Sequence, residues 1–403
     1  MKRIVQINTT CGAGSTGKIC VAVSRLLTEQ GIENSVFYTH GSSDYPLGIH
    51  FGTPAYKKVQ ALRSRVLGNY GFNSKRITKQ MIAELDRIRP DAVHLHNIHG
   101  HDCDLELLFT YFKSRGIKVF WTFHDCWAFT GYCPHFDMIG CDRWQTGCGD
   151  CPQRRKYSWF LDRSGTLFRR KKELFAGLDL TVITPSAWLG DLVRQSFLGG
   201  YPVHVIHNGI DLSVFRPTPR DAREKYGLEG KKVLLGVTFG WSIRKGLDVF
   251  IELASRLDDT YRIVLVGTDK SVDKLLPPGI LSIHRTKNQA ELAELYTAAD
   301  LFVNPTREEN YPTVNMEALA CGTPVVTFRT GGSPEIIDPT CGSVVPKNDV
   351  DALEREIIRV CAERPYSKAA CLAKAQSFDQ RKRFLEYTEL YREIPSSHTS
   401  ESI

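Results

Sequence analysis

Strand-like apolar runs alternate with helical segments almost throughout the chain, and this alternation restricts the fold more than any other feature. Parallel strands need a crossover between them, usually a helix, so the alternation predicts doubly wound parallel sheets with helices on both faces. The expected strands form two series: Ile4–Ile7, Ser35–Tyr38, Ala92–Leu95, Val119–Phe123 and Leu180–Ile183, then Lys232–Phe239, Arg262–Val266, Leu281–His284, Leu301–Val303 and Val325–Phe328. The sequence therefore predicts an α/β protein with two Rossmann-like domains.

The length of 403 residues, with 42% hydrophobic and 24% charged residues, suits two globular domains. We expect one Rossmann-like domain over residues 1–215, with a cysteine-rich insertion at 133–151, and a second one over residues 216–379. A helix over residues 380–395 is expected to return to the N-terminal domain, and the polar tail 396–403 is predicted to be disordered.

The chain is expected to be cytoplasmic, because no run approaches the roughly 18 apolar residues of a membrane span. Met1–Asn8 starts basic but is interrupted by Gln6, which indicates a first strand and not a signal peptide. The net charge is +7, and no nucleic-acid motif accompanies it. Basic residues gather in two groups that suit anionic lipids or phosphate-bearing acceptors, although solvated helix faces explain them about equally well. The groups are Lys57, Lys58, Arg63, Arg65, Lys75, Arg76 and Lys79, and Arg154, Arg155, Lys156, Arg169, Arg170, Lys171 and Lys172.

A glycine-rich loop, Gly12–Lys18, follows the first expected strand and nearly matches the phosphate-binding pattern G-x-x-x-x-G-K-[ST]. The match fails at Ile19, because isoleucine cannot supply the hydroxyl that holds Mg²⁺. We therefore interpret the loop as a tight turn that lets a substrate approach the backbone, and not as the site of an ATPase or GTPase.

Two glutamates, Glu309 and Glu317, stand seven residues apart in the strand–loop–helix–turn–strand segment Asn304–Val326. Ligands of open α/β sheets bind at the carboxyl ends of the strands, where a helix N-terminus offers amides to anions. A nucleotide sugar needs such amides and a cation for its diphosphate, and fixed acceptors for its hydroxyls. Two solvated helix-end acids are the less favoured alternative.

The segment Asn304–Val326 resembles the donor-site signature of the retaining family 4 glycosyltransferases, which have the GT-B fold. The resemblance implies two facing Rossmann-like domains with an interdomain cleft, with residues 1–215 as the acceptor domain and residues 216–379 as the nucleotide-sugar domain. It also implies transfer with retention of configuration, without a catalytic metal or an enzyme nucleophile. By the same resemblance, Glu309 contacts the donor sugar and Glu317 the ribose. The family usually has Gly-Phe-Gly after the first glutamate, whereas this chain has Asn310-Tyr311-Pro312.

Further donor contacts follow from the resemblance. Asn310, Tyr311 and Thr313 are expected to line the donor site. Lys245, at the expected start of a helix, is expected to neutralise the negative charge on the departing diphosphate. The family commonly has an arginine five residues earlier, where this chain has Gly240, and Arg244 is the candidate for a second positive charge. An ordinary solvated helix start is the alternative for both cations.

On the N-terminal side, His124 resembles the family's histidine that contacts the donor. Its neighbour Asp125 is expected either to orient His124 or to face the acceptor hydroxyl. The glycine-rich loop has a counterpart in the family, so Gly12, Gly14 and Gly17 are expected near the donor and Ser15 near the acceptor.

Two clusters contain residue types that bind metals. The histidines lack a recognised ligand spacing, so packed histidines are favoured there over a metal site. The cysteines end in a Cys-Gly-Asp-Cys knuckle, which favours a structural zinc site over free thiols and over an iron–sulfur or redox role. The clusters are His94, His96, His99 and His101, and Cys133, Cys141, Cys148 and Cys151.

The run from His124 to Gly131, followed by these cysteines, resembles a subgroup of the family 4 glycosyltransferases that acts in exopolysaccharide and capsule assembly. This resemblance implies a retaining glycosyltransferase of bacterial surface-polysaccharide synthesis. The expected donor is a UDP- or GDP-sugar, and the expected acceptor is a lipid-linked saccharide at the inner face of the cytoplasmic membrane. No cofactor is expected in catalysis. The alternatives are a glycan synthase of the same fold with a soluble acceptor, and a non-catalytic protein that binds nucleotide sugars.

Overall fold

The computed structural model describes residues 2–99, 101–219, 221–392 and 394. Contacts divide the chain into two compact units, of which one contains the chain up to Ile206 and the C-terminal helix from Phe384, and the other contains His207–Arg383. This division precedes the expected join near residue 215, because Ile210 and Phe215 pack into the core of the second unit. The tail predicted at 396–403 lies outside the described residues.

The first unit contains a parallel sheet with the strand order β3-β2-β1-β4-β5-β6-β7. Its strands are β1 (Arg3–Asn8), β2 (Glu33–Tyr38), β3 (Gly48–His50), β4 (Ala92–Leu95), β5 (Lys118–Thr122), β6 (Leu180–Thr184) and β7 (Val203–Val205). Its helices are α1 (Gly14–Glu29), α2 (Pro54–Leu67), α3 (Lys75–Ile88), α4 (Leu105–Arg115), α5 (Arg154–Tyr157), α6 (Ser164–Phe175), α7 (Ala187–Gln195) and the C-terminal α16 (Gln380–Arg392), with a 3-10 turn η1 at Trp127–Phe129.

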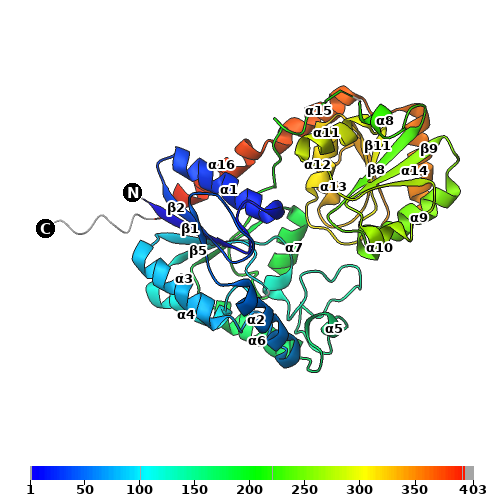
Figure 1. Cartoon of the computed structure of the whole chain (residues 1–403). Helices are drawn as coiled ribbons and strands as arrows, with labels where there is room; N and C mark the ends of the chain where they lie inside the picture. The colour runs from blue at the N-terminus through cyan, green and yellow to red at the C-terminus, as the bar shows by residue number, and fades with distance from the viewer. Residues whose placement is uncertain (1, 100, 220, 393, 395–403) are drawn as a thin grey trace. The chain divides into compact units, whose positions relative to one another are not determined.

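Neighbouring residues of the first sheet enter two different cores, because successive side chains of a strand point to opposite faces. Ile4 packs in one core with Ile19 of α1 and Phe384 of α16. Val5 packs in the other core with Phe109 of α4. Helices therefore cover both faces of this sheet, with α1 and α16 along one face and α3 and α4 along the other (Figure 1).

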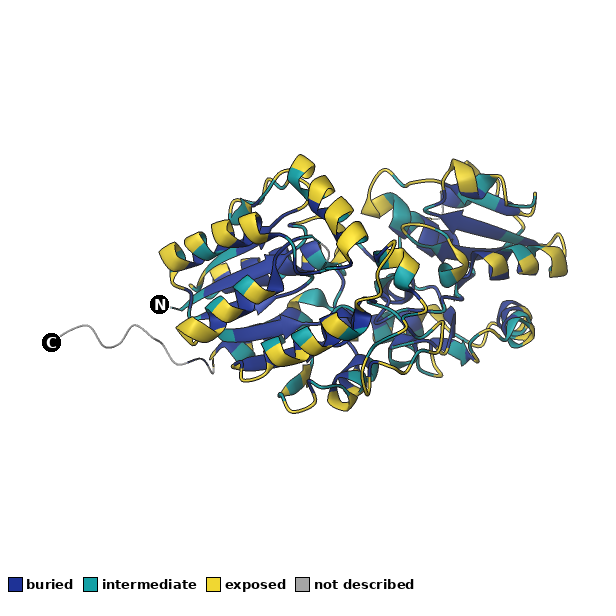
Figure 2. Ribbon diagram, turned by 90° about the horizontal axis from the view of Figure 1, so that it is seen from below, coloured by how far each residue is buried: buried dark blue, intermediate teal, exposed yellow. Residues whose placement is uncertain are grey.

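The second unit repeats this architecture with the parallel strand order β10-β9-β8-β11-β12-β13. Its strands are β8 (Lys232–Val237), β9 (Tyr261–Val266), β10 (Ile280–Ile283), β11 (Leu301–Asn304), β12 (Val325–Phe328) and β13 (Gly342–Val345). Its helices are α8 (Ala222–Lys225), α9 (Leu247–Arg256), α10 (Lys270–Asp273), α11 (Gln289–Ala298), α12 (Thr313–Ala320), α13 (Ser333–Ile336), α14 (Val350–Glu363) and α15 (Lys368–Ala375), with 3-10 turns η2 at Ile243–Lys245 and η3 at Gln376–Phe378. In both units the central strands are buried, and exposed residues lie on the outer faces of the helices (Figure 2).

The expected alternation and two-sheet architecture are confirmed, and every predicted strand occurs with small shifts of its ends. The sequence analysis missed β3, β7 and β13, which are only three or four residues long and all lie at sheet edges. Such strands carry too few apolar residues to give a periodic signal. Among the described residues, no helix is long and apolar enough to cross a membrane.

Candidate active site

The second sheet has a switch point between β8 and β11. After β8 the chain continues to β9 and β10 on one side of this strand, whereas β11, β12 and β13 lie on the other side. The loops that leave β8 and β11 therefore diverge at the carboxyl ends of adjacent strands, which is the position where open α/β sheets bind ligands. Lys245 follows β8 and Glu309 follows β11, so both predicted donor-site residues lie at this switch point.

The loop after β8 packs tightly on the loop after β11. Gly246 has φ +79°, and a Cβ atom there would lie 2.5 Å from the carbonyl oxygen of Pro305. The Arg307 amide also donates to the carbonyl oxygen of Arg244, with an N–O distance of 2.9 Å. Only glycine fits this approach without strain. The prediction that Lys245 starts a helix is wrong, because Lys245 ends η2 and the left-handed Gly246 separates it from α9.

Lys245 and Glu309 form an ion pair. The Lys245 ammonium donates to Glu309 Oε2 at 2.5 Å, and the two side chains are 18% and 25% exposed. The other oxygen, Oε1, accepts the Asn310 amide at 3.2 Å. A partly buried cation can neutralise a phosphate, and a fixed carboxylate can accept hydrogen bonds from sugar hydroxyls.

Glu317 is held from the interior of the unit. The hydroxyl of Tyr296, which is wholly buried, donates to Glu317 Oε2 at 2.9 Å. Burial, and secondly the charge of Glu317, raise the pKa of Tyr296 far above its ordinary value, so the phenol remains a donor. The carboxylate on α12 is therefore held in a defined position.

The remaining predicted donor residues differ in exposure. Asn310 is buried, and its carbonyl oxygen accepts the Gly332 amide at 2.7 Å. The Tyr311 ring is also buried and stacks on His207, with 4.8 Å between the ring centroids and 16° between the planes. Thr313 is partly exposed at the start of α12, which has no side-chain cap. Of these three side chains, Thr313 is the one placed to meet a ligand, while Tyr311 packs inside the unit.

A third loop, which the sequence analysis missed, packs against the Glu309 loop. A Cβ atom at Gly331, which has φ +53°, would lie 1.7 Å from the carbonyl oxygen of Glu309. On either side of the glycine pair, the hydroxyls of Thr330 and Ser333 are buried and have no hydrogen-bond partner in the part of the chain that the structure describes. The Gly-Gly pair, two residues beyond the end of β12, was the signal that could have identified this loop.

The first sheet has its own switch point, between β1 and β4. The glycine-rich loop follows β1, with Gly12 at φ +74° and Gly14 at φ +65°. The Gly12 amide donates to the Gly17 carbonyl at 3.0 Å, and a Cβ atom at Gly17 would lie 2.6 Å from Thr10 Oγ1. Gly14 and Ser15 are exposed in the first turn of α1, where no side chain caps the amides. This turn can meet an anion.

His124 follows β5, next to the switch point. Its Nε2 lies 3.1 Å from Nδ1 of His96, and His96 Nε2 lies 3.2 Å from Gln6 Oε1. Burial lowers the pKa of His124 to about 4, although the charge of Asp125 acts in the opposite direction. The imidazole is therefore neutral at physiological pH, where it can exchange hydrogen bonds but carries no charge.

Asp125 contacts a different histidine from the one that sequence proximity suggested. Its Oδ2 binds His99 Nε2 at 2.9 Å, and its Oδ1 accepts the Trp127 amide at 2.9 Å. Burial acts to raise the pKa of Asp125, but the charge and hydrogen bond of His99 outweigh it and lower this pKa to about 2. Asp125 is therefore an ionised anchor for His99 and for the turn η1.

In the first histidine cluster, His94 and His96 are packed in the interior of the unit, whereas His99 and His101 are partly exposed. His94 and His96 are 0% and 1% exposed, and His94 contacts Thr122 Oγ1 at 2.8 Å and the Tyr391 hydroxyl. Across the described residues, no three His, Cys, Asp or Glu side chains are arranged to hold a metal ion.

The four clustered cysteines border one small cavity of about 20 Å³. None of the four forms a disulfide, and Cys148 Sγ accepts the Gly131 amide at 3.2 Å. Burial raises the pKa of Cys133 to about 12 and that of Cys148 to about 11. The thiols are grouped but not placed as ligands, so structural zinc remains a prediction.

Two members of the predicted basic groups do not belong to the surface. Lys57 is mostly buried and pairs with Asp102 at 2.7 Å. Lys171 is wholly buried and donates to the carbonyl oxygens of Trp127 and Thr130 at 2.7 and 3.0 Å. Burial lowers the pKa of Lys171 to about 7.

Comparison with known proteins agrees with this arrangement. The model for Glycosyltransferase Family 4 matches residues 16–214, and the model for Glycosyl transferases group 1 matches residues 231–363. The chain is 22% identical, over 372 residues, to a putative colanic acid biosynthesis glycosyl transferase, WcaC, of Escherichia coli (strain K12), which covers 86% of this chain and 88% of that protein. It is 30% identical over 248 residues to a D-inositol 3-phosphate glycosyltransferase of Saccharomonospora viridis, covering 55% of this chain and 57% of the relative.

Solved structures share the fold. A sucrose-phosphate synthase from Thermosynechococcus elongatus superposes with a TM-score of 0.72 at 18% identity, covering 97% of this chain and 98% of that one. Anabaena HepE in complex with UDP gives a TM-score of 0.69 at 15% identity, covering 97% and 100%. The two family models together span most of the sequence and the fold is GT-B, so the chain belongs to the family 4, or group 1, glycosyltransferases.

Proposed function

We propose that this glycosyltransferase transfers a sugar, with retention of configuration, from a nucleotide-sugar donor to a lipid-linked saccharide in surface-polysaccharide synthesis. The observation that carries the proposal is the Lys245–Glu309 ion pair at the β8/β11 switch point. It joins a cation suited to a diphosphate and a carboxylate suited to sugar hydroxyls within one pair of loops.

Different residues of the second unit contact different parts of the donor in this proposal. Lys245 receives the negative charge that grows on the leaving diphosphate, with Arg244 as a second cation. Glu309 accepts hydrogen bonds from the sugar, and Glu317, held by Tyr296, accepts them from the ribose. The uncapped first turn of α12, at Thr313, adds backbone amides.

The first unit supplies neutral and backbone groups. Gly14 and Gly17 shape the turn that meets the donor, and Ser15 lies beside them for the acceptor. His124, neutral at physiological pH, can accept or donate a hydrogen bond in the reaction. Asp125 acts through His99 and holds this group of side chains in position.

The reaction is proposed to need no catalytic metal, because positioning and the Lys245 cation can stabilise the leaving group. The role in polysaccharide synthesis is supported by similarity to the WcaC protein, which is named for colanic acid biosynthesis. A lipid-linked saccharide is the acceptor class that we propose with this role. A uracil nucleotide is the first donor to test, because the HepE structure, which shares this fold, contains UDP-glucose.

A thermal-shift screen against UDP, GDP, ADP and their sugars tests the donor site, since a ligand that binds only the folded state raises the Tm. Stabilisation by one diphosphate family, lost in Lys245→Ala, is expected. The selected donor is then incubated with lipid-linked and soluble acceptors. Binding without transfer would favour a sugar-nucleotide-binding protein, and transfer only to a soluble acceptor would favour the glycan synthase alternative.

A further inference from the structure

Helix α2 has an inverted polarity. Its buried side chains include Gln60 and Ser64, which are 4% and 1% exposed, and Gln60 Oε1 and Ser64 Oγ have no hydrogen-bond partner within the described residues. Its exposed face is apolar, with Leu62 55% exposed. Apolar residues three or four positions apart share one face of a helix. The exposed apolar residues of α2 are Val59, Leu62, Val66 and Leu67.

A second exposed apolar segment, Trp159–Leu161, lies against the end of α2. The Trp159 amide donates to the carbonyl oxygen of Arg65 at 2.8 Å, and Ser158 Oγ reaches the same oxygen at 3.4 Å. Phe160 is 66% exposed. The segment directly follows α5, which lies at the same end of the first unit as α2 (Figure 1). The two elements therefore form one apolar surface, which we call the α2–Trp159 face and define as the exposed apolar residues of α2 together with Trp159, Phe160 and Leu161.

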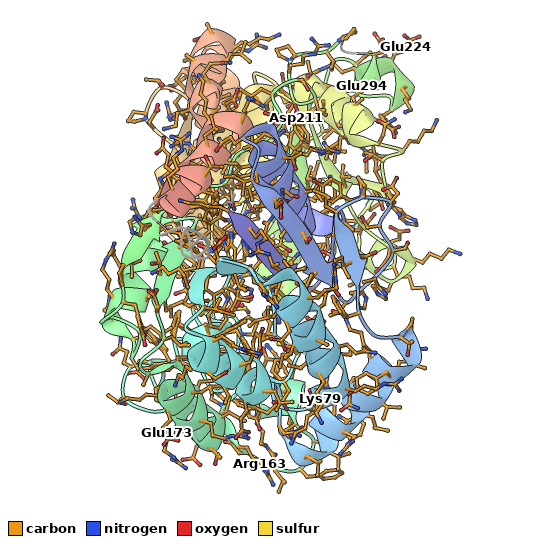
Figure 3. The ribbon with its side chains drawn as sticks, turned by 90° about the vertical axis from the view of Figure 1, so that its left-hand side faces the viewer. Lys79, Arg163, Glu173, Asp211, Glu224 and Glu294 are labelled. Carbon is orange, nitrogen blue, oxygen red and sulfur yellow. The ribbon has the colours of Figure 1, made fainter. Side chains whose placement is uncertain are left out.

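Charge around this face is mostly basic. Every charged residue of α2 is basic, and Lys58 and Arg63 are exposed beside its apolar residues. Arg155, Lys156 and Arg163 are exposed on either side of Trp159–Leu161, and Arg163 is labelled in Figure 3. The only acid in 154–163 is Asp162, whose carboxylate oxygens are engaged by the backbone amides of Cys151 and Ser164.

The apolar centre and the basic rim together indicate what kind of partner binds this face. A large exposed apolar patch marks an interaction surface, and aromatic and aliphatic side chains rimmed mostly by Lys and Arg match the boundary between acyl chains and anionic headgroups. The long basic side chains can keep their charges among phosphates while their stems cover apolar surface. A protein partner would have to offer a mostly acidic rim around an apolar centre.

We propose that the α2–Trp159 face docks on an anionic lipid bilayer, with Leu62, Trp159 and Phe160 inserted at the level of the headgroups. The attachment is peripheral. It uses no residue of the donor site, and it would bring the first unit to the surface where a lipid-linked acceptor is found.

The test is flotation of the full chain with vesicles of phosphatidylcholine alone or mixed with phosphatidylglycerol. We expect binding to the anionic vesicles, weakened in about 0.5 M salt because the attraction is screened. The double variant Leu62→Ser, Phe160→Ser should lose at least roughly tenfold in vesicle affinity, since it removes two apolar anchors. Arg63→Gln with Lys156→Gln should weaken binding only to the anionic vesicles.

The matched control is Leu275→Ser in the second unit, whose side chain is 61% exposed outside this face, and it should bind vesicles like the unaltered chain. Unchanged Tm and unchanged nucleoside diphosphate binding establish that the variants are folded, and also separate this proposal from the donor site. Failure of the folded chain to float with anionic vesicles would overturn the proposal. It would equally be overturned if the double variant floated normally but converted a self-associated protein to a monomer, because the face would then be a protein interface.

Discussion

Replacing Glu309 by glutamine should separate affinity for the nucleotide from turnover. In the structure, Lys245 is engaged by the Glu309 carboxylate at 2.5 Å. An arriving diphosphate must compete with that carboxylate for the ammonium and is also repelled by its charge. Glu309→Gln removes both effects. We therefore expect tighter binding of the nucleoside diphosphate, together with slower sugar transfer because the amide presents a donor group to the sugar hydroxyls.

The size of the effect follows from the burial of the pair. Two unit charges about 4 Å apart attract by about 4 kcal/mol at an effective dielectric constant of about 20, whereas fully exposed pairs contribute about 0–1 kcal/mol. Side chains that are 18% and 25% exposed lie between these cases. A net change of about 1–2 kcal/mol corresponds to roughly 5- to 30-fold tighter binding.

Isothermal titration calorimetry with the diphosphate selected by the screen measures this change, using Glu309→Gln, Lys245→Met and the double variant. The gain should nearly vanish when Lys245 is already methionine, because no ammonium is left to release. Glu224→Gln makes the same charge change on α8 (Figure 3), which precedes β8, whereas the donor loops follow the strands. If folded Glu309→Gln bound the diphosphate no better than Glu224→Gln, the competition between carboxylate and phosphate would be refuted.

Three further predictions test other groups. Glu317→Gln should weaken binding of the free nucleoside diphosphate severalfold by calorimetry, because an amide replaces an acceptor of ribose hydroxyl protons, and unchanged affinity would remove the ribose assignment. Burial lowers the pKa of His94 to about 3, below its value in the unfolded chain, so the unfolded chain binds more protons between these two values. The free energy of unfolding, measured with denaturant, should therefore fall from about pH 7 towards pH 4. For this residue the slope is up to about 1.4 kcal/mol per pH unit. His94→Gln should flatten that slope while the exposed His284→Gln should not, and equal slopes in all three proteins would contradict the reasoning. Elemental analysis should find about one Zn²⁺ per chain, and Cys148→Ser and Cys151→Ser should lower metal content and Tm together. Brief EDTA treatment should leave sugar transfer intact. Protein that contains no zinc when purified without chelator would refute the zinc site.

Some features of the candidate site can be predicted from residue patterns, whereas its contacts between distant segments cannot. The Glu309–Glu317 spacing and the glycine-rich loop can be identified along the chain because each lies within one segment. The pairing of Lys245 with Glu309 joins positions 64 residues apart, and it exists because β8 and β11 are neighbours in the sheet. Asp125 stands beside His124 in the sequence, yet its carboxylate binds His99, which arrives from the loop after the neighbouring strand β4.

The sequence by itself determined the two parallel α/β units, because the alternation of strands and helices is a local pattern of apolar residues, and the longer strands carry enough of it to be identified. Tertiary structure alone decided the edge strands β3, β7 and β13, the burial of Lys57 and Lys171 within apparently basic surfaces, and the outward-facing apolar side of α2. Burial and pairing depend on which distant segments pack together. The order of residue types along one segment does not identify those packing partners.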